Sequence, residues 1–185
     1  MGDFSAEELL NRLRVRAGLI AAVAVILLAQ PTWLSLIEGA FISLLGLSIR
    51  AWASGHLRKE KKLAVSGPYR YSRNPLYLGN FILGLSIVAG SRSWWVVGVF
   101  VTYFTIFYPL IIRREKERMK ELFPEQYEEY RKRVPSFFPS LKRQNLASQI
   151  NFSRSLYKQN KEYRALIGTV AFWLILAAKI LLLNR

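Results

Sequence analysis

Five stretches of apolar residues constrain the fold of this chain more than any other feature. They run roughly from Leu13 to Ala29, Trp33 to Ala53, Leu76 to Ala89, Trp94 to Ile112 and Ala165 to Leu183. About 20 mostly apolar residues cross a bilayer as a helix, in which every backbone group bonds within the segment. The chain is therefore predicted to be an all-α integral membrane protein with about five transmembrane helices.

The first and third stretches are shorter than a full crossing. Either interface residues such as Leu13 and Asn74 lengthen them, or neighbouring helices shield them. A cleaved signal peptide is an alternative for the first stretch, because three arginines precede it. No small-residue cleavage site comes before Gln30 and Pro31, so we expect a retained span. The chain has no internal repeat and no low-complexity linker, which predicts a single domain over residues 1–185.

Basic residues set the expected orientation. The chain has 27 Lys and Arg against 12 Asp and Glu. All but Arg92, Lys179 and Arg185 fall in the N-terminal segment or around the connections after the second and fourth stretches. Positive charge is retained on the cytoplasmic side, so the N-terminus and these connections are predicted to be cytoplasmic and the C-terminus to lie opposite. This segregation argues against a nucleic-acid partner, which needs one basic stripe on a soluble fold.

Two of the cytoplasmic segments are longer than turns: Gly55 to Asn74 and Arg113 to Arg164. Chemistry is expected there, between a cytosolic cofactor and the lipid phase. The chain has no cysteine, and a lone histidine, His56, does not make a metal site, so no metal is predicted.

The first segment ends in SGPYRYSRNPLYLG, from Ser66 to Gly79. Asn74 is a favoured helix N-cap and Pro75 suits the first helical position, which explains both residues without any function. The arginines and tyrosines beside them fit either anchors at the membrane interface or the wall of a binding site.

The second segment begins with RREKERMKELFPEQYEEYRKRVP, from Arg113 to Pro135. At helical spacing, Glu115 falls within its narrow apolar stripe, so this carboxylate is expected on the buried side. A buried charge needs a partner, which is either an arginine of the chain or a ligand cation. Tyr127 and Tyr130 share a helix face and either stack on a ligand ring or anchor the interface.

Together the two segments resemble the isoprenylcysteine carboxyl methyltransferase family and the related phospholipid methyltransferases. The resemblance covers Leu63 to Pro139, with LAVSGPYRYSRNPLYLG followed by REKERMKELFPEQYEEYRKRVPSFFP. It implies a membrane enzyme that uses S-adenosylmethionine, with cytosolic-side amphipathic helices forming the cofactor pocket. The cofactor-binding core would span residues 56–139, and residues 140–185 would supply a connector and the last transmembrane helix.

The resemblance also implies roles for individual residues. Its catalytic candidates are Tyr77, bordering the passage to the lipid, and Arg113 or Arg114, which lie close to the family's substrate arginine position at Ile111. Its cofactor-binding candidates are Leu63, Tyr69, Arg73, Asn74, Pro75, Tyr77 and Glu115.

Three positions depart from the family pattern: Asn74 replaces a histidine, Lys116 a second glutamate and Pro124 a glycine. Asparagine cannot carry a proton, whereas a carboxylate acceptor is ionised at neutral pH and needs no base. An amine acceptor must be neutral to attack. The sequence therefore predicts S-adenosylmethionine-dependent methyl transfer to a lipophilic, membrane-embedded acceptor, with a carboxylate slightly favoured over an amine.

Two other functions remain open. Membrane sterol reductases share a related helical core, so an NADPH-dependent enzyme is one alternative. A non-catalytic lipid-binding relative is the other. The segment from Ser140 to Arg164 lies outside the resemblance, and it reads either as an amphipathic surface helix covering the pocket or as a connector.

Overall fold

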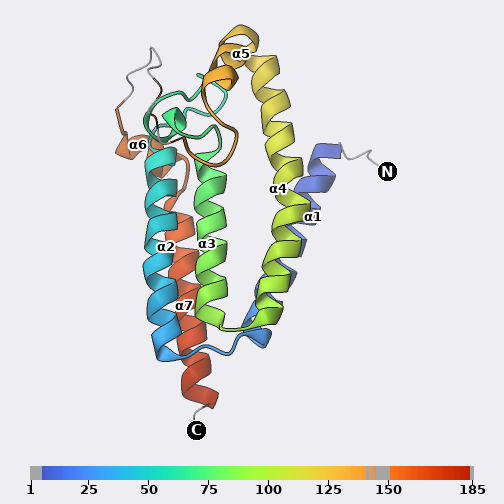
Figure 1. Ribbon diagram of the computed structural model, residues 1–185, viewed down its shortest axis with the longest axis vertical. Helices are drawn as coiled ribbons and strands as arrows, with labels where there is room; N and C mark the ends of the chain where they lie inside the picture. The colour runs from blue at the N-terminus through green and yellow to red at the C-terminus, as the bar shows by residue number, and fades with distance from the viewer. Residues whose placement is uncertain (1–5, 141, 143, 145–150, 184–185) are drawn as a thin grey trace.

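The computed structural model describes residues 6–140, 142, 144 and 151–183, and in this part of the chain every regular element is a helix. Figure 1 shows the long helices side by side, with the short elements gathered at one end. In chain order the elements are α1 (Ala6–Leu28), α2 (Trp33–Ser54), the short 3₁₀ helix η1 (Gly67–Arg70), α3 (Pro75–Ser91), α4 (Trp94–Leu122), α5 (Pro124–Arg133), α6 (Arg154–Gln159) and α7 (Tyr163–Leu183).

The five long helices coincide with the five predicted apolar stretches. Helices α2, α4 and α7 are each long and apolar enough to cross a membrane. Helix α4 continues past Ile112, where its apolar part ends, to Leu122 without interruption. Helix α1 begins well before the predicted Leu13 and carries Arg12, Arg14 and Arg16. The all-α membrane fold is thus confirmed. Of the five predicted spans, however, only α2, α4 and α7 meet that length and apolarity among the described residues, since α1 carries its arginines and α3 is short.

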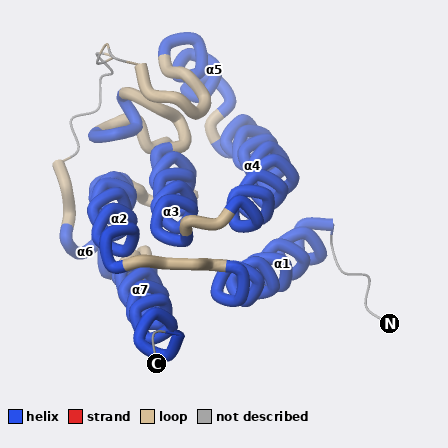
Figure 2. Tube along the Cα trace, turned by 60° about the horizontal axis from the view of Figure 1, so that its bottom comes forward, coloured by secondary structure: helices blue, strands red, loops and turns tan. Residues whose placement is uncertain are grey.

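Helix α3 is short, and its neighbours shield it. Its 17 residues rise only about 25 Å as a helix. Leu85 is its one exposed residue. Helices α2 and α4 pack on either side of it (Figure 2). Shielding by protein, one of the two predicted explanations, therefore accounts for the short span.

Small residues bring α2 and α3 into close contact. A Cβ atom at Gly46 would lie 2.9 Å from the carbonyl oxygen of Gly79, and a Cβ at Gly79 would lie 2.9 Å from that of Gly46. Ser35 Oγ donates to the carbonyl oxygen of Gly90 at 2.8 Å. Such small-residue contacts are typical of packing between membrane helices.

Lysine 179 joins α7 to the end of α1. Its Nζ donates to the carbonyl oxygens of Ile26, Leu27 and Ala29 at 2.6, 2.8 and 2.8 Å. These carbonyls belong to the end of α1, where a helix leaves its last acceptors without partners. The ammonium therefore caps α1 from another helix. Arg185, which was also assigned to this side, lies outside the described residues.

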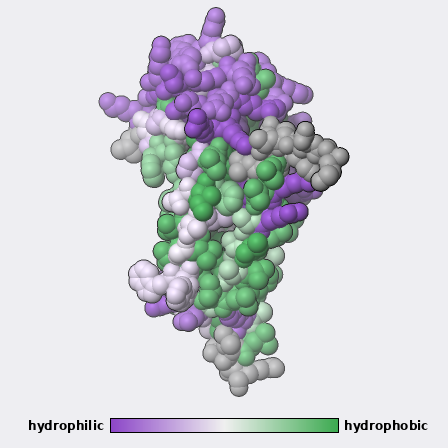
Figure 3. All heavy atoms as spheres, turned by 90° about the vertical axis from the view of Figure 1, so that its right-hand side faces the viewer, coloured by the Kyte–Doolittle hydropathy of each residue, from purple (hydrophilic) through white to green (hydrophobic). Residues whose placement is uncertain are grey.

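The surface divides into a hydrophobic body and a polar end. Figure 3 shows hydrophilic residues over the upper end and hydrophobic residues along the body below it. At the opposite end, Trp33, Trp94 and Trp95 are exposed, as in the aromatic belts of membrane proteins. Helix α1 begins toward the polar end and α7 ends at the other (Figure 1).

Candidate functional site

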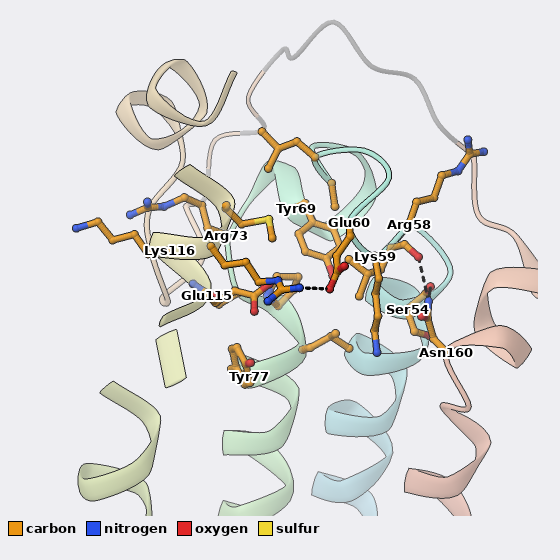
Figure 4. Close-up of a pocket in the computed structure, with 18 of the residues that line it drawn as sticks. Ser54, Arg58, Lys59, Glu60, Tyr69, Arg73, Tyr77, Glu115, Lys116 and Asn160 are labelled. Atoms are coloured by element: carbon orange, nitrogen blue, oxygen red, sulfur yellow. Dashed lines mark hydrogen bonds and ion pairs between the residues drawn. The ribbon is translucent and has the colours of Figure 1, made fainter. Parts of the chain in front are cut away.

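A cavity of about 550 Å³ lies at the polar end, above α2, α3 and α4. Its walls come from the loop after α2, from η1, from the beginning of α3, from the charged part of α4, from α5, and from the segment before α7. Figure 4 shows Tyr77 at its lower end, Glu115 on the α4 side, and Ser54 and Asn160 on the opposite side. The volume is within the range of small-molecule sites.

All seven predicted cofactor-binding residues line this cavity. They converge from separate parts of the chain: the loop after α2, η1, the corner between η1 and α3, and α4. The full set is Leu63, Tyr69, Arg73, Asn74, Pro75, Tyr77 and Glu115.

The corner from Arg73 to Tyr77 forms the beginning of α3. Asn74 occupies the N-cap position as predicted, but its side chain makes no capping hydrogen bond, which corrects the predicted role. Its Nδ2 instead donates to the carbonyl oxygen of Ser136 at 2.8 Å. The amide thus fastens the corner to the segment after α5, and it leaves the first turn of α3 without a side-chain cap.

Arginine 73 presents an unsatisfied donor in the cavity wall. Its Nη1 donates to the Tyr127 hydroxyl at 3.0 Å, and its Cζ lies 5.8 Å from the centroid of that ring. Its Nε is buried and makes no hydrogen bond to any described residue. A buried donor without an acceptor costs free energy. Because Arg73 also lines the cavity and makes no ion pair with a described carboxylate, its guanidinium is well placed to receive an anionic ligand.

Tyr127 and Tyr130 belong to the protein interior, so neither is an interface anchor. They form a buried apolar cluster with Leu63 and Val134. Tyr130 donates to the carbonyl oxygen of Tyr69 at 2.7 Å, which ties α5 to η1. Burial raises the pKa of both the Tyr69 and the Tyr130 hydroxyl, so both stay protonated at neutral pH.

Glu115 is the one cavity carboxylate without an ion-pair partner among the described residues. Glu162 pairs with Arg50, and Glu60 Oε1 lies 2.6 Å from Arg118 Nη2. The helical pattern correctly placed Glu115 on the side of the cavity. The side chain is exposed rather than buried, which corrects the expectation.

The surroundings of Glu115 still disfavour its charge. Although the residue is exposed, the cavity walls withdraw its carboxyl group in part from bulk water. This raises its pKa above the ordinary value, and Glu60 adds to this rise. The positive charges of Arg118 and Lys59 lower the pKa, but they do not reverse the shift. An ionised Glu115 would therefore gain from a ligand cation.

The two candidate catalytic arginines do not line the cavity. Arg113 is on the exposed side of α4, where its Nε donates to Glu117 at 3.1 Å. Arg114 is partly buried on the same helix, also away from the cavity lining. The structure therefore does not support a substrate role for either residue, and among the predicted catalytic residues only Tyr77 faces the cavity.

The sequence analysis did not single out several polar residues of the site, among them Arg50, Asn80, Asn160 and Glu162. Asn160 Nδ2 donates to the carbonyl oxygens of Ser54 and Leu57 at 2.9 and 3.0 Å, which holds the segment before α7 against the end of α2. Arg50 could have been noticed, because a charge within an apolar span usually has a function. Part of this connector, residues 145–150, lies outside the described residues.

A comparison with protein families matches residues 19–126 to the phospholipid methyltransferase family. The chain belongs to this family. The matched region of this phospholipid methyltransferase homologue contains the Arg73 to Tyr77 corner and Glu115, whereas Asn160 and Glu162 lie beyond it.

Two curated relatives are similar to part of this family member. The cobalt-zinc-cadmium resistance protein CzcN of Cupriavidus metallidurans is 37% identical over 106 residues, which cover 54% of this chain and 49% of that protein. The nickel-cobalt-cadmium resistance protein NccN of Alcaligenes xylosoxydans xylosoxydans is 32% identical over 132 residues, 64% of this chain and 62% of that protein. The aligned region thus spans about half to three fifths of these relatives. No solved structure matches the chain.

Proposed function

We propose that this protein is a membrane methyltransferase that transfers the methyl group of S-adenosylmethionine to a lipophilic acceptor. One observation carries the proposal. Among the residues that the structure describes, Glu115 is a carboxylate without an ion-pair partner and Arg73 a guanidinium without a carboxylate partner, and both line the same cavity. Such a pair complements a zwitterion, and the amino-acid part of S-adenosylmethionine is one.

The residues present fit this cofactor. Arg73 lines the cavity without a carboxylate partner among the described residues. In the first turn of α3, Pro75 has no N–H and the N–H groups of Tyr77 and Leu78 donate to the Asn74 carbonyl oxygen, which leaves the N–H of Leu76 for a carboxylate. Glu115 would accept hydrogen bonds from the ammonium group. Leu63, Tyr69 and Tyr77 add apolar and aromatic surface to the remaining wall.

When bound, S-adenosylmethionine supplies an activated methyl group. The protein's part is to hold donor and acceptor in line and to keep water away. Asn74 stands at the position where the family pattern has histidine. Its amide donates to the carbonyl oxygen of Ser136 and cannot take up a proton. This supports an acceptor that is already ionised, a carboxylate, ahead of an amine.

We further propose that the cavity and the N-terminal end are cytoplasmic and that α7 ends on the other side. The basic residues around the cavity support this orientation. A lipid or prenylated molecule would then meet a cytosolic cofactor at the inner leaflet.

Cofactor binding in detergent tests the proposal. Calorimetry with S-adenosylhomocysteine should show binding to the wild-type protein and a loss of about 10–100-fold for Arg73→Met and for Glu115→Gln, since a hydrogen bond to a charged group is worth about 1.5–3 kcal/mol. Arg133→Met, which removes an exposed arginine paired with Glu129, should bind normally. Binding of NADPH alone would favour a reductase, and binding of neither molecule a non-catalytic protein.

Incubation with methyl-labelled S-adenosylmethionine and a total lipid extract then distinguishes the acceptors. Label released by base as volatile methanol indicates a carboxyl ester. Base-stable label would show that nitrogen is methylated and would contradict the preference for a carboxylate.

A further inference from the structure

Helices α2 and α3 and the residue before α7 meet in a polar cluster at the cavity. Arg50 of α2 donates from Nε to Glu162 Oε1, the residue just before α7, at 2.5 Å. Its Nη1 donates to Asn80 Oδ1 of α3. The side chains of Arg50 and Glu162 are only 17% and 8% exposed. Because a charge at this depth is costly, its placement at the cavity requires an explanation.

The packing of α2 on α3 fixes the position of Arg50. Its side-chain stem lies against Gly79, where a Cβ atom would be 2.5 Å from Arg50 Cγ. Gly79 is the last residue of the SGPYRYSRNPLYLG motif. The absence of a side chain there lets the guanidinium reach the cavity, which Arg50 lines together with Asn80 and Glu162.

One edge of this guanidinium is left for a ligand. Nε and Nη1 are engaged by Glu162 and Asn80, whereas Nη2 makes no hydrogen bond within the described parts of the chain. Lys59 extends from the loop after α2 down toward the same side of the cavity (Figure 4). It makes no ion pair with a described residue.

The balance of charge around the cavity favours an anion there. Seven basic side chains line the cavity, against the three carboxylates of Glu60, Glu115 and Glu162. The proposed cofactor would bind Arg73 and carries a net positive charge of its own. With the cofactor bound, the cavity would therefore still hold an excess of positive charge. The seven basic residues are Arg50, Arg58, Lys59, Lys62, Arg73, Lys116 and Arg118.

We propose that Arg50, held in place by Glu162 and Asn80, recognises the anionic group of the methyl acceptor where α2, α3 and the segment before α7 line the cavity. Lys59 adds a second positive charge to this subsite. That the bound molecule is a methyl acceptor rests on the proposed function. The subsite by itself is a site that binds the anionic group of an amphiphile. It lies partly outside the family-matched region, because Glu162 follows residue 126.

A purely structural role is the competing explanation, in which the Arg50–Glu162 pair only fastens α7 to α2. Exchanging the two charges separates the explanations. The Arg50→Glu and Glu162→Arg double variant keeps an ion pair between α2 and α7 but removes the positive charge from position 50. Arg133→Met serves as the control for losing one positive charge on an exposed surface.

The experiment measures binding of dodecanoate, dodecyl phosphate, dodecylamine and methyl dodecanoate to the full chain in nanodiscs of uncharged lipid. We expect both anions to bind better than the amine and the ester. Arg50→Lys should weaken anion binding about tenfold, as expected for one charge-assisted hydrogen bond. Comparing dodecanoate with dodecyl phosphate identifies the preferred anion.

The double variant should recover the thermal stability lost in Arg50→Glu without recovering anion affinity. Recovery of both would overturn the assignment to Arg50, because an arginine at position 162, which also lines the cavity, would then serve as well. If the double variant does not fold, Arg50→Lys decides: unchanged dodecanoate and dodecyl phosphate affinity overturns the proposal. S-adenosylhomocysteine affinity is measured on the same samples. If the wild type does not bind S-adenosylhomocysteine, the proposed function is refuted. Anion binding that depends on Arg50 would still support the subsite.

Discussion

The hydroxyl of Tyr130 donates to the backbone carbonyl oxygen of Tyr69 across a distance of 2.7 Å. Both residues are buried, one on α5 and the other on η1, and both line the cavity. Together with the bonds from Arg73 to Tyr127 and from Asn74 to Ser136, this bond connects α5 and the segment after it to η1 and the corner that precedes α3.

Replacing Tyr130 by phenylalanine should lower the stability of the polar end. The substitution leaves the Tyr69 carbonyl without its partner, which costs about 1–3 kcal/mol for a buried group. We expect a fall of several degrees in the melting temperature and weaker cofactor binding, measured by thermal shift and calorimetry. Tyr163→Phe changes a more exposed tyrosine and should have no effect. Equal stability of the two variants would contradict this account.

Replacing Lys179 by methionine should loosen the end of α1. Three carbonyl oxygens lose their donor, and hydrogen bonds to a charged group contribute about 1.5–3 kcal/mol. Hydrogen exchange at Val25 to Ala29 should accelerate, with a lower melting temperature. Lys120→Met removes an exposed ion pair with Glu128, worth at most about 1 kcal/mol, and should change little. Unchanged exchange in α1 would show that the cap does not matter.

The glycines of the membrane helices offer a matched pair of substitutions. A Cβ at Gly79 would lie 2.5 Å from Arg50 Cγ and 2.9 Å from the Gly46 carbonyl oxygen, while a Cβ at Gly98 would meet nothing within 4 Å. Gly79→Ala should therefore destabilise the protein by about 1–3 kcal/mol through overpacking. Gly98→Ala should be neutral or stabilise α4 by up to about 1 kcal/mol. Thermal unfolding of both variants is the measurement, and a stable Gly79→Ala would contradict the close helix contact.

The membrane helices were predictable because the bilayer imposes one strong rule on a sequence. A run such as Trp94 to Ile112 can satisfy its backbone groups in lipid only as a helix. The position of Glu115 on the cavity side of α4 followed from helical periodicity, since α4 continues unbroken through it. Its exposure did not follow, because periodicity does not show how open a cavity is.

Contacts between distant segments could not be predicted in the same way. Local preference predicted that the Asn74 side chain caps α3. The side chain instead donates a hydrogen bond to the carbonyl oxygen of Ser136, 62 residues away. Arg50 and Glu162 are 112 residues apart. Arg50 lies outside the two polar segments, and Glu162 lies in the part of the second segment beyond the family resemblance. Only the fold brings these two residues together, so no local sequence pattern predicts that they pair.

The pKa of Glu115 gives a prediction that separates stability from binding. Glu115 lies beyond Ile112, and withdrawal from bulk water raises its pKa above the value it has in the unfolded chain. At neutral pH, keeping this carboxylate ionised in the folded state therefore lowers the free energy of unfolding. A glutamine at this position carries no charge and has no such effect. Glu115→Gln should melt at a higher temperature than the wild type at pH 7 while binding S-adenosylhomocysteine about 10–100-fold more weakly.

The sign of the pH dependence follows from linkage. A raised pKa in the folded state means that the folded protein binds the proton more tightly, so the wild type gains stability as the pH falls through that raised pKa. The advantage of Glu115→Gln should shrink over this range and disappear below the unfolded value of 4.5. Melting temperatures of both proteins between pH 4 and pH 8, without ligand, are the measurement. A glutamine variant that is less stable at neutral pH would mean that an ion pair, and not a ligand, balances the charge of Glu115.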